Sequence, residues 1–302
     1  MTNDRAGGGR QRASGVAGSG IRAARLNPTA RAFLCDPAAL AGVGILTAIT
    51  ALAVLAPWLF PGDPLAMVAQ PLLWPGELAA YPLGSDSMGR DLLACIAHGA
   101  RVSLAVGLVA AVLSVLLGTL IGALSGYFGG WIDDLLVRIT ELFQTVPSFL
   151  LVIVLVTIAR PSAAVVVLAI GLASWPVIAR LVRAEFRSLR EREFVTAARA
   201  QGMSHLRIIT REILPNAAPP VIVTTSVLVA TAILMESALS FLGLTDPNSV
   251  SWGRMIGEGR EFLRTAWYLS AAPGLAIVTT VLALNLVGDG LNDAFNPRLR
   301  RP

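Results

Sequence analysis

The sequence predicts an all-α integral membrane protein with six transmembrane helices. Of its 302 residues, 55% are hydrophobic and only 14% are charged, and the apolar residues gather in long runs. Soluble domains carry about 25% charged residues, so a chain this poor in charge is suited to a lipid bilayer. The formal net charge of +5 comes entirely from arginine, since the sequence contains no lysine. These arginines are spread over several loops without a known nucleic-acid-binding motif, so no nucleic acid is expected as a partner.

Six apolar stretches are each long enough to cross the hydrocarbon core, which takes about 20 residues. The first is stopped by Pro61 and Pro64, and the third begins as an amphipathic segment and continues through Pro147. In chain order, the stretches are residues 40–60, 102–127, 131–158, 163–182, 220–242 and 269–287. An even number of spans places both termini on the same side of the membrane.

The distribution of arginine predicts which side that is. Six arginines lie in the N-terminal tail, eight in residues 180–211 and three at the C-terminus, whereas the loops on the opposite side hold six. Positive charge in short loops favours the cytoplasmic side. Both termini and the loop 183–219 are therefore predicted to be cytoplasmic.

This topology divides the chain into a cytoplasmic tail, a first transmembrane helix, an extracytoplasmic loop, a five-helix core that includes the loop 183–219, and a cytoplasmic C-terminus. In that order the regions are residues 1–39, 40–60, 61–101, 102–290 and 291–302. The start of the tail is rich in Gly, Ala and Arg and is expected to be disordered. Cys35 and Cys95 fall on opposite sides of the membrane, so no disulfide is expected. His98 and His205 lack neighbouring ligands, so no metal site is expected either.

The cytoplasmic loop reads as two short helices joined by a turn. Gly202 ends the first helix, since glycine accepts the positive φ found there, and Ser204 can cap the second. Pro215 is expected to stop the second helix before the next span begins. The apolar face of this second helix comprises Leu206, Ile209 and Ile213.

Small residues surround the turn and would let another surface approach the backbone closely. They are Ala197, Ala198 and Ala200. Two interpretations follow from this pattern. The helix-turn inserts into a groove on a soluble partner, or the basic amphipathic helix lies on anionic lipid headgroups.

The same segment resembles the EAA loop of permease subunits of ATP-binding-cassette (ABC) importers. The family pattern is Glu-Ala-Ala, three residues, Gly, nine residues, Ile, one residue, Leu-Pro. The sequence departs from it at Thr196, where the pattern has Glu, and at Glu212, where it has Ile. The residues that match in register are Ala197, Ala198, Gly202, Leu214 and Pro215. This resemblance favours docking of a partner over binding to headgroups.

The resemblance extends over residues 30–298 and is to the second permease of dipeptide and oligopeptide importers. Residues 81–91 resemble the outer-loop signature of that subfamily, with Gly84, Asp86, Gly89, Arg90 and Asp91. Four further segments resemble the subfamily in order and spacing. They are residues 99–104, 126–131, 239–244 with 251–253, and 288–291.

The resemblance implies a type I ABC importer permease fold in the bacterial plasma (inner) membrane, moving di- or oligopeptides by alternating access. The implied partners are a second permease, two ABC ATPases inside and a substrate-binding protein outside. ATP and Mg would be bound by the ATPases, and this chain would bind no cofactor. Transport of nickel chelates or another small solute is the alternative within the class. An ion-coupled secondary transporter is the rival from another class, and an integral membrane enzyme is a more distant one.

The polar residues of the spans support no catalytic site. The sequence has neither G-x-x-x-x-G-K-[ST] nor G-x-S-x-G. Glu236 is an acid inside an apolar stretch, where a charge costs about 2.5–3.5 kcal/mol. It either lines the pathway and meets peptide ammonium groups, or fixes helix packing by hydrogen bonds, which is the favoured interpretation. Asp133, Asp134, Arg138 and Glu141 are expected to form a solvated cytoplasmic face, and Asp86 and Arg90 an i, i+4 pair.

Overall fold

The computed structural model describes residues 28–295, and these contain helices but no β-strand. The expected tail residues 1–27 and C-terminal residues 296–302 lie outside this described part. The long helices are α2 (Pro37–Leu59), α3 (Leu92–Phe128), α4 (Gly130–Thr145), α5 (Ser148–Ala159), α6 (Ala163–Arg190), α9 (Leu214–Phe241) and α11 (Tyr268–Phe295). The short ones are α1 (Pro28–Leu34), α7 (Glu193–Ala200), α8 (His205–Arg207), η1 (Ile208–Ile213), α10 (Trp252–Gly259) and η2 (Arg260–Phe262).

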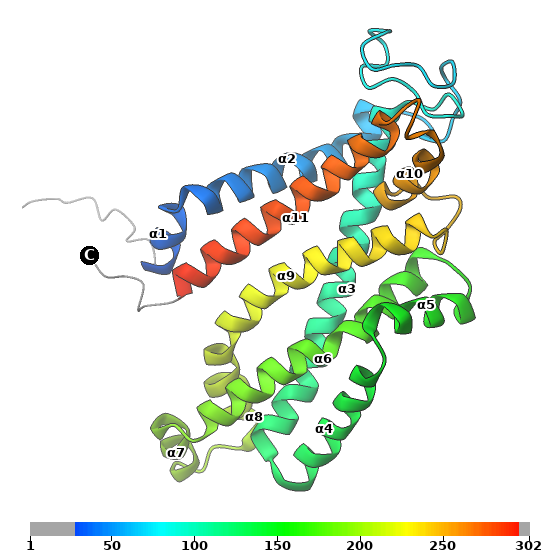
Figure 1. The fold of residues 1–302 in the computed structure, drawn as a ribbon. Coiled ribbons are helices and arrows are strands. Elements are labelled where there is room, and N and C mark those ends of the chain that lie inside the picture. Colours follow the sequence, from blue (N-terminus) through cyan, green and yellow to red (C-terminus); the bar gives the residue numbers. More distant parts are fainter. Residues whose placement is uncertain (1–27, 296–302) are drawn as a thin grey trace, which may run out of the picture.

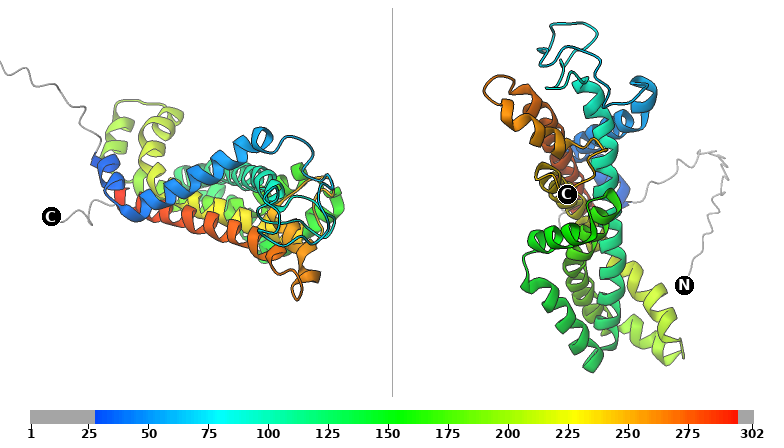
Figure 2. Two further views of the ribbon diagram at one scale, coloured as in Figure 1. Left: turned by 90° about the horizontal axis from the view of Figure 1, so that it is seen from above. Right: turned by 90° about the vertical axis from the view of Figure 1, so that its right-hand side faces the viewer.

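The long helices pack in a chain of neighbours, α2 against α11, α11 against α9, α9 against α3, and α3 against α6. Figure 1 shows that the loop after α2 and helix α10 gather at one end of this bundle, while α7 and α8 lie at the other. Both views of Figure 2 show the α7–α8 pair projecting from the side of the bundle. The segments expected on opposite sides of a membrane are thus at opposite ends of the molecule.

The contact between α3 and α6 depends on three glycines at intervals of four residues. Gly118, Gly122 and Gly126 lie on one face of α3, where a Cβ atom would come within 2.5–2.7 Å of backbone oxygens of α6. Glycines at this spacing allow two helix backbones to approach closely inside a membrane. Close approach of the backbones therefore defines this helix pair.

Five helices among the described residues are long and apolar enough to cross a membrane, and α4 with α5 would make a sixth if the two form one broken span. The expected continuous third span is corrected here, because α4 and α5 meet at a bend of 82°. Val146 has an extended backbone and precedes Pro147. A proline favours an extended conformation for the residue before it, and here the helix ends at this point.

The expected stop at Pro215 is also wrong. Residues His205–Phe241 form one helical run of 37 residues, in which the wider π-helical turn η1 joins α8 to α9. Pro215 sits in the first turn of α9, where η1 precedes it. A π-helical segment changes the hydrogen-bond partners of the backbone locally, and the chain continues as a helix into the next span.

Candidate functional site

Helix α7 ends in a turn whose geometry requires glycine. Gly202 has a φ of +75°. Its N–H donates to the carbonyl of Arg199 at 3.0 Å, and the Met203 N–H donates to the carbonyl of Ala198 at 3.1 Å. This pair of bonds is the Schellman motif, in which a residue with positive φ satisfies the last carbonyls of a helix. The predicted role of Gly202 as a helix terminator is confirmed.

The four small residues 196–198 and 200 do not share one face of α7. Thr196 and Ala197 are exposed, as is Ala200, but Ala198 is buried. Ala198 and the fully buried Val195 join a cluster of apolar side chains from α3, α6 and α9. The outer surface of the turn is therefore made by Thr196, Ala197 and Ala200, while Ala198 holds α7 to the body of the protein.

The second helix of the loop buries two of the three residues of the expected face. Ile213 is fully buried and Ile209 packs against the same apolar cluster, but Leu206 is 71% exposed and Ile208 is fully buried in its place. The π-helical turn covers this segment, and its wider winding changes which side chains face inward. Ser204 occupies the N-cap position, but its side chain makes no capping hydrogen bond. Leu214 and Pro215 lie on α9 rather than on the exposed turn, with Leu214 packed against the same apolar cluster.

Aromatic and cationic contacts fix α7 and α8 to the end of α3. The Tyr127 hydroxyl and the His205 Nδ1 atom lie 2.8 Å apart, within hydrogen-bond distance. The Arg199 guanidinium lies over the Tyr127 ring, 5.7 Å from its centroid, a contact that favours the cation. Arg190 donates to the carbonyls of Gly126 and Tyr127 at 3.3 Å. A displacement of α7 would therefore be transmitted directly to the end of α3.

The junction between α3, α4 and α6 contains an ion pair that the sequence analysis missed. Asp133 accepts hydrogen bonds from Arg183 at 2.6 and 2.7 Å and another from the Ser125 hydroxyl. The Asp133 side chain is 12% exposed, so it is not part of a solvated face. Arg138 and Glu141 do lie on an exposed face, where they pair at 3.7 Å and their side chains are 83% and 60% exposed.

The outer-loop signature builds the turn that leads into α3. Asp86 Oδ1 accepts hydrogen bonds from the backbone N–H groups of Met88 and Arg90, both at 2.8 Å. Asp91 caps α3 by accepting from the Leu93 N–H at 2.9 Å. Gly84 and Gly89 have φ values of +77° and +79°, and a Cβ on either would collide with a backbone carbonyl. These signature residues therefore stabilise the local structure of the loop.

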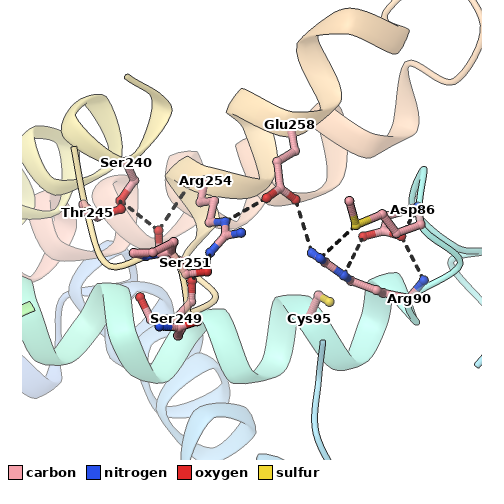
Figure 3. A network of polar contacts seen from close by, with 12 residues as sticks. Asp86, Arg90, Cys95, Ser240, Thr245, Ser249, Ser251, Arg254 and Glu258 are labelled. Carbon is pink, nitrogen blue, oxygen red and sulfur yellow. Dashed lines mark hydrogen bonds and ion pairs between the residues drawn. The ribbon is translucent and has the colours of Figure 1, made fainter. Parts of the chain in front are cut away.

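Arg90 also connects this loop to α10. Its guanidinium lies 3.7 Å from Asp86 and 3.5 Å from Glu258, which in turn pairs with Arg254 at 2.7 Å. Figure 3 shows these four side chains in one row between the loop and α10. The Asp86–Arg90 pair is confirmed, and Glu258 is a second partner of Arg90 that was not expected. The partner is 168 residues away in sequence, so no local pattern could have revealed it.

Glu236 is 1% exposed and lies among hydroxyl groups. Ser103 donates to its Oε2 atom at 3.0 Å, and Ser240 donates to its Oε1 atom at 2.6 Å. Ser251 reaches Ser240 at 3.0 Å, so the network joins α9 to the N-terminus of α10. Hydrogen bonds of this kind connect helices within a membrane, and the geometry agrees with the packing interpretation.

Two of the segments that resembled the second permease, residues 99–104 and 239–244 with 251–253, meet around this network. Trp252 is buried and donates its indole N–H to the Ile96 carbonyl at 3.0 Å. A Cβ on Gly253 would lie 2.4 Å from Ser237 Cα. Gly243 ends α9 with a φ of +76°. These two segments therefore serve the packing of α3, α9 and α10.

No group of three or more His, Cys, Asp and Glu side chains within residues 28–295 is placed to hold a metal ion. Cys35 is exposed and Cys95 is buried, and both thiols are free. The described residues thus offer an exposed turn of small residues at one end, a buried polar network near the other, and no assembled metal centre.

A bundle of apolar helices with a projecting basic helix-turn is the architecture of a transport permease. The family described as "Binding-protein-dependent transport system inner membrane component" matches residues 115–301. The chain belongs to this family.

Two curated relatives and one solved structure illustrate the match. The "Di/tripeptide transport system permease protein DppC" of Pseudomonas aeruginosa is 38% identical over 276 residues, covering 89% of this chain and 91% of the relative. The "Dipeptide transport system permease protein DppC" of Escherichia coli is 40% identical over 275 residues, covering 89% and 92%. The inward-facing MetNI methionine ABC transporter aligns with a TM-score of 0.54 at 16% identity, over 67% of this chain and 97% of the other. The last likeness concerns the fold.

Proposed function

We propose that this chain is a translocating subunit of an ATP-driven importer of di- or oligopeptides. The observation that carries the proposal is the 38–40% identity, over nine-tenths of the chain, with permeases named for dipeptide and di/tripeptide transport. Hydrolysis of ATP belongs to partner ATPases, which hold the ATP and Mg. A second permease and an extracytoplasmic substrate-binding protein complete the assembly.

In this proposal both termini and the α7–α8 pair are cytoplasmic, in the bacterial inner membrane. The arginine distribution supports this orientation. The loop after α2 and helix α10 then face the binding protein on the outside.

The exposed side of the α7 turn is the proposed contact with an ATPase. Thr196, Ala197 and Ala200 are exposed and small, so a partner can approach the helix closely there. Leu206 offers a 71% exposed apolar side chain next to the turn, and the adjacent Arg207 is exposed as well. A small-residue surface with an apolar and a basic neighbour suits insertion into a groove with acidic edges.

Movement of the ATPases would act on the bundle through α7. Val195 and Ala198 pack into the apolar cluster that also holds Phe186 of α6 and Ile213 of η1. Cores packed in this way switch between discrete arrangements rather than deform continuously. Displacing α7 would therefore re-orient α6 and α9 together and expose the pathway alternately to the two sides.

Reconstituted transport tests the proposed class. The complete complex is placed in liposomes with the binding protein outside and ATP inside, and uptake of a labelled dipeptide is measured. We expect uptake that requires both ATP and the binding protein. Uptake driven by an ion gradient without ATP would instead identify a secondary transporter. Uptake of a nickel chelate but of no peptide would show that the substrate is a nickel chelate and not a peptide.

A charged substitution tests the proposed contact. Ala197→Glu places a carboxylate on the exposed surface of the turn, where the proposal buries it against the ATPase. An unpaired buried charge costs about 3–5 kcal/mol, so the ATPases should no longer co-purify with the tagged permease. The matched control is Ala184→Glu, at an exposed alanine of α6 outside the turn, which should retain them. Retention of the ATPases by both variants would rule out this surface.

A further inference from the structure

A cavity of about 540 Å³ lies where α9 ends and α10 begins. Its walls come from the end of α9, the link through Thr245 and Asp246, helix α10 and the short helix η2. Ligand sites for small molecules have volumes of about 300–1,000 Å³ and combine apolar walls with a few polar groups. This cavity is therefore large enough for a short peptide.

Charged side chains of both signs line this cavity. Arg254 and Glu258 pair with each other at 2.7 Å, and Arg254 also donates to the carbonyl of Ser249 at 3.2 Å. Their charges are therefore largely satisfied within the protein, as Figure 3 shows for the Arg254–Glu258 pair. They shape the cavity wall rather than offer a free charge to a ligand.

Two neighbouring residues of η2 are different. Arg260 and Glu261 are both exposed, both line the cavity, and neither forms an ion pair with any residue of the described part 28–295. The Arg260 guanidinium lies 5.3 Å from the centroid of the Phe241 ring, so an aromatic face positions it without neutralising it. One cation and one anion thus stand unpaired at the edge of the same cavity.

The wall beneath them is polar as well. Ser240 lines the cavity, and its hydroxyl lies 3.1 Å from that of Thr245 and donates to the buried carboxylate of Glu236 at 2.6 Å. Asp246 adds a half-buried carboxylate to the side where Glu261 stands alone. Around the opening of the cavity, hydrogen-bond acceptors are therefore more numerous than the single unpaired guanidinium, that of Arg260.

We propose that this cavity receives the peptide as it leaves the binding protein, with Arg260 holding the terminal carboxylate and Glu261 holding the terminal ammonium group. Guanidinium and carboxylate groups form strong charge-assisted hydrogen bonds, and a zwitterionic peptide presents one group for each. The inference rests on the proposed function, because it names the place on this chain where an imported peptide first binds.

The test compares variants of the whole reconstituted complex with three substrates. They are dialanine, N-acetyl-dialanine and dialanine amide, each supplied at saturating binding protein. Every rate is divided by the wild-type rate for the same peptide, which removes the preference of the binding protein. Arg260→Gln should lower uptake of dialanine several-fold and leave dialanine amide unchanged, since the amide has no carboxylate to lose. Glu261→Gln should lower uptake of dialanine and leave the acetylated peptide unchanged.

The matched control is Arg264→Gln, at an exposed arginine that does not line the cavity. It should transport all three peptides at wild-type rates. An equal loss for all three peptides in the Arg260 or Glu261 variants would indicate a structural role and overturn the inference, as would no loss at all. Failure of the proposed function gives a different result, namely a wild-type complex that moves none of the peptides.

Discussion

The carboxylate of Asp133 and the guanidinium of Arg183 are joined by two hydrogen bonds, at 2.6 and 2.7 Å. The pair fixes the beginning of α4 to the C-terminal part of α6. It lies beside Gly122 and Gly126, where α3 and α6 approach each other closely. Three helices are therefore held in register at the end of the bundle that carries α7.

Removing either member of this pair should destabilise the permease. Arg183→Ala leaves a largely buried carboxylate without its partner, and hydrogen bonds to charged groups contribute about 1.5–3 kcal/mol. The free energy of unfolding is measured in mixed detergent micelles for both single variants and for Asp133→Ala/Arg183→Ala. We expect the double variant to lose less than the sum of the two single losses, which is the signature of a direct interaction.

The pair on α4 supplies the comparison. Arg138→Ala breaks the Arg138–Glu141 pair, whose side chains are 83% and 60% exposed. Exposed pairs contribute about 0–1 kcal/mol, so this variant should unfold almost as the wild type does. If the losses in the free energy of unfolding of Asp133→Ala and Arg183→Ala simply added in the double variant, the two residues would not stabilise each other.

A methyl group at Gly122 should force α3 and α6 apart. The Cβ of Gly122→Ala would lie 2.5 Å from the carbonyl oxygen of Ala179, and a backbone atom cannot move aside as a flexible side chain can. Overpacking of this kind costs about 1–3 kcal/mol, which a lower thermal midpoint of the purified complex would report. Gly274→Ala is the control, since beyond the adjacent part of α11 itself no atom of the described residues lies within 4 Å of a Cβ at that position. A midpoint equal to that of the control would contradict the close packing.

The orientation in the membrane can be read from single-cysteine labelling. In a background without Cys35 and Cys95, Ser204→Cys should react with an impermeant reagent only from the cytoplasm, and Pro75→Cys only from outside. Both positions are exposed; Ser204 lies between α7 and α8 and Pro75 in the loop after α2, and Figure 1 shows these two segments at opposite ends of the molecule. Labelling of position 204 on intact cells would show that the predicted topology is inverted.

Two substitutions at Glu236 separate packing from a role in the pathway. Glu236→Gln keeps the shape and most hydrogen bonds of the side chain, so assembly and peptide uptake should stay close to wild type. Glu236→Leu leaves the hydroxyls of Ser103 and Ser240 without their acceptor. Each unsatisfied buried group costs about 1–3 kcal/mol, so the second variant should assemble poorly.

Uptake of free and N-acetylated dipeptides by the Gln variant decides between the two roles. A well-assembled Gln variant that loses uptake of the free peptide alone would show that the charge itself meets the substrate. Equal and undiminished uptake of both peptides would assign Glu236 to packing.

Composition and local pattern were enough to predict the helical membrane fold, the Gly202 turn and the Asp86–Arg90 pair. These features depend on residues close together in the chain. The sequence could not indicate that Asp133 meets Arg183, because the two are separated by 50 residues and either could equally have faced solvent. The same holds for Glu258, which pairs with Arg90 of the loop from helix α10.

The errors within the loop 183–219 have separate physical causes. The sequence predicts a regular helix from Leu206 onward, but the π-helical turn at residues 208–213 widens the winding and places Ile208 inside. A stop is predicted at Pro215, but the π-helical turn before this proline changes the backbone hydrogen-bond partners, and the helical run continues through it. The small size of Ala198 predicts a place on the outer surface of the turn, but Ala198 packs into the core beside Val195.

Helix α9 connects the end of the bundle that carries α7 to the end that carries α10. At about 1.5 Å per residue, its 28 residues measure about 42 Å. A helix transmits rotation as well as translation, so a twist at its first turn is passed along to Glu236 and Ser240 near its last turn. Successive residues of a helix are about 100° apart, and adding one residue midway, near Thr231, would rotate the end of α9 out of phase with α10. The sensitivity of such a chain to insertions should therefore follow the helical period rather than the distance from either end.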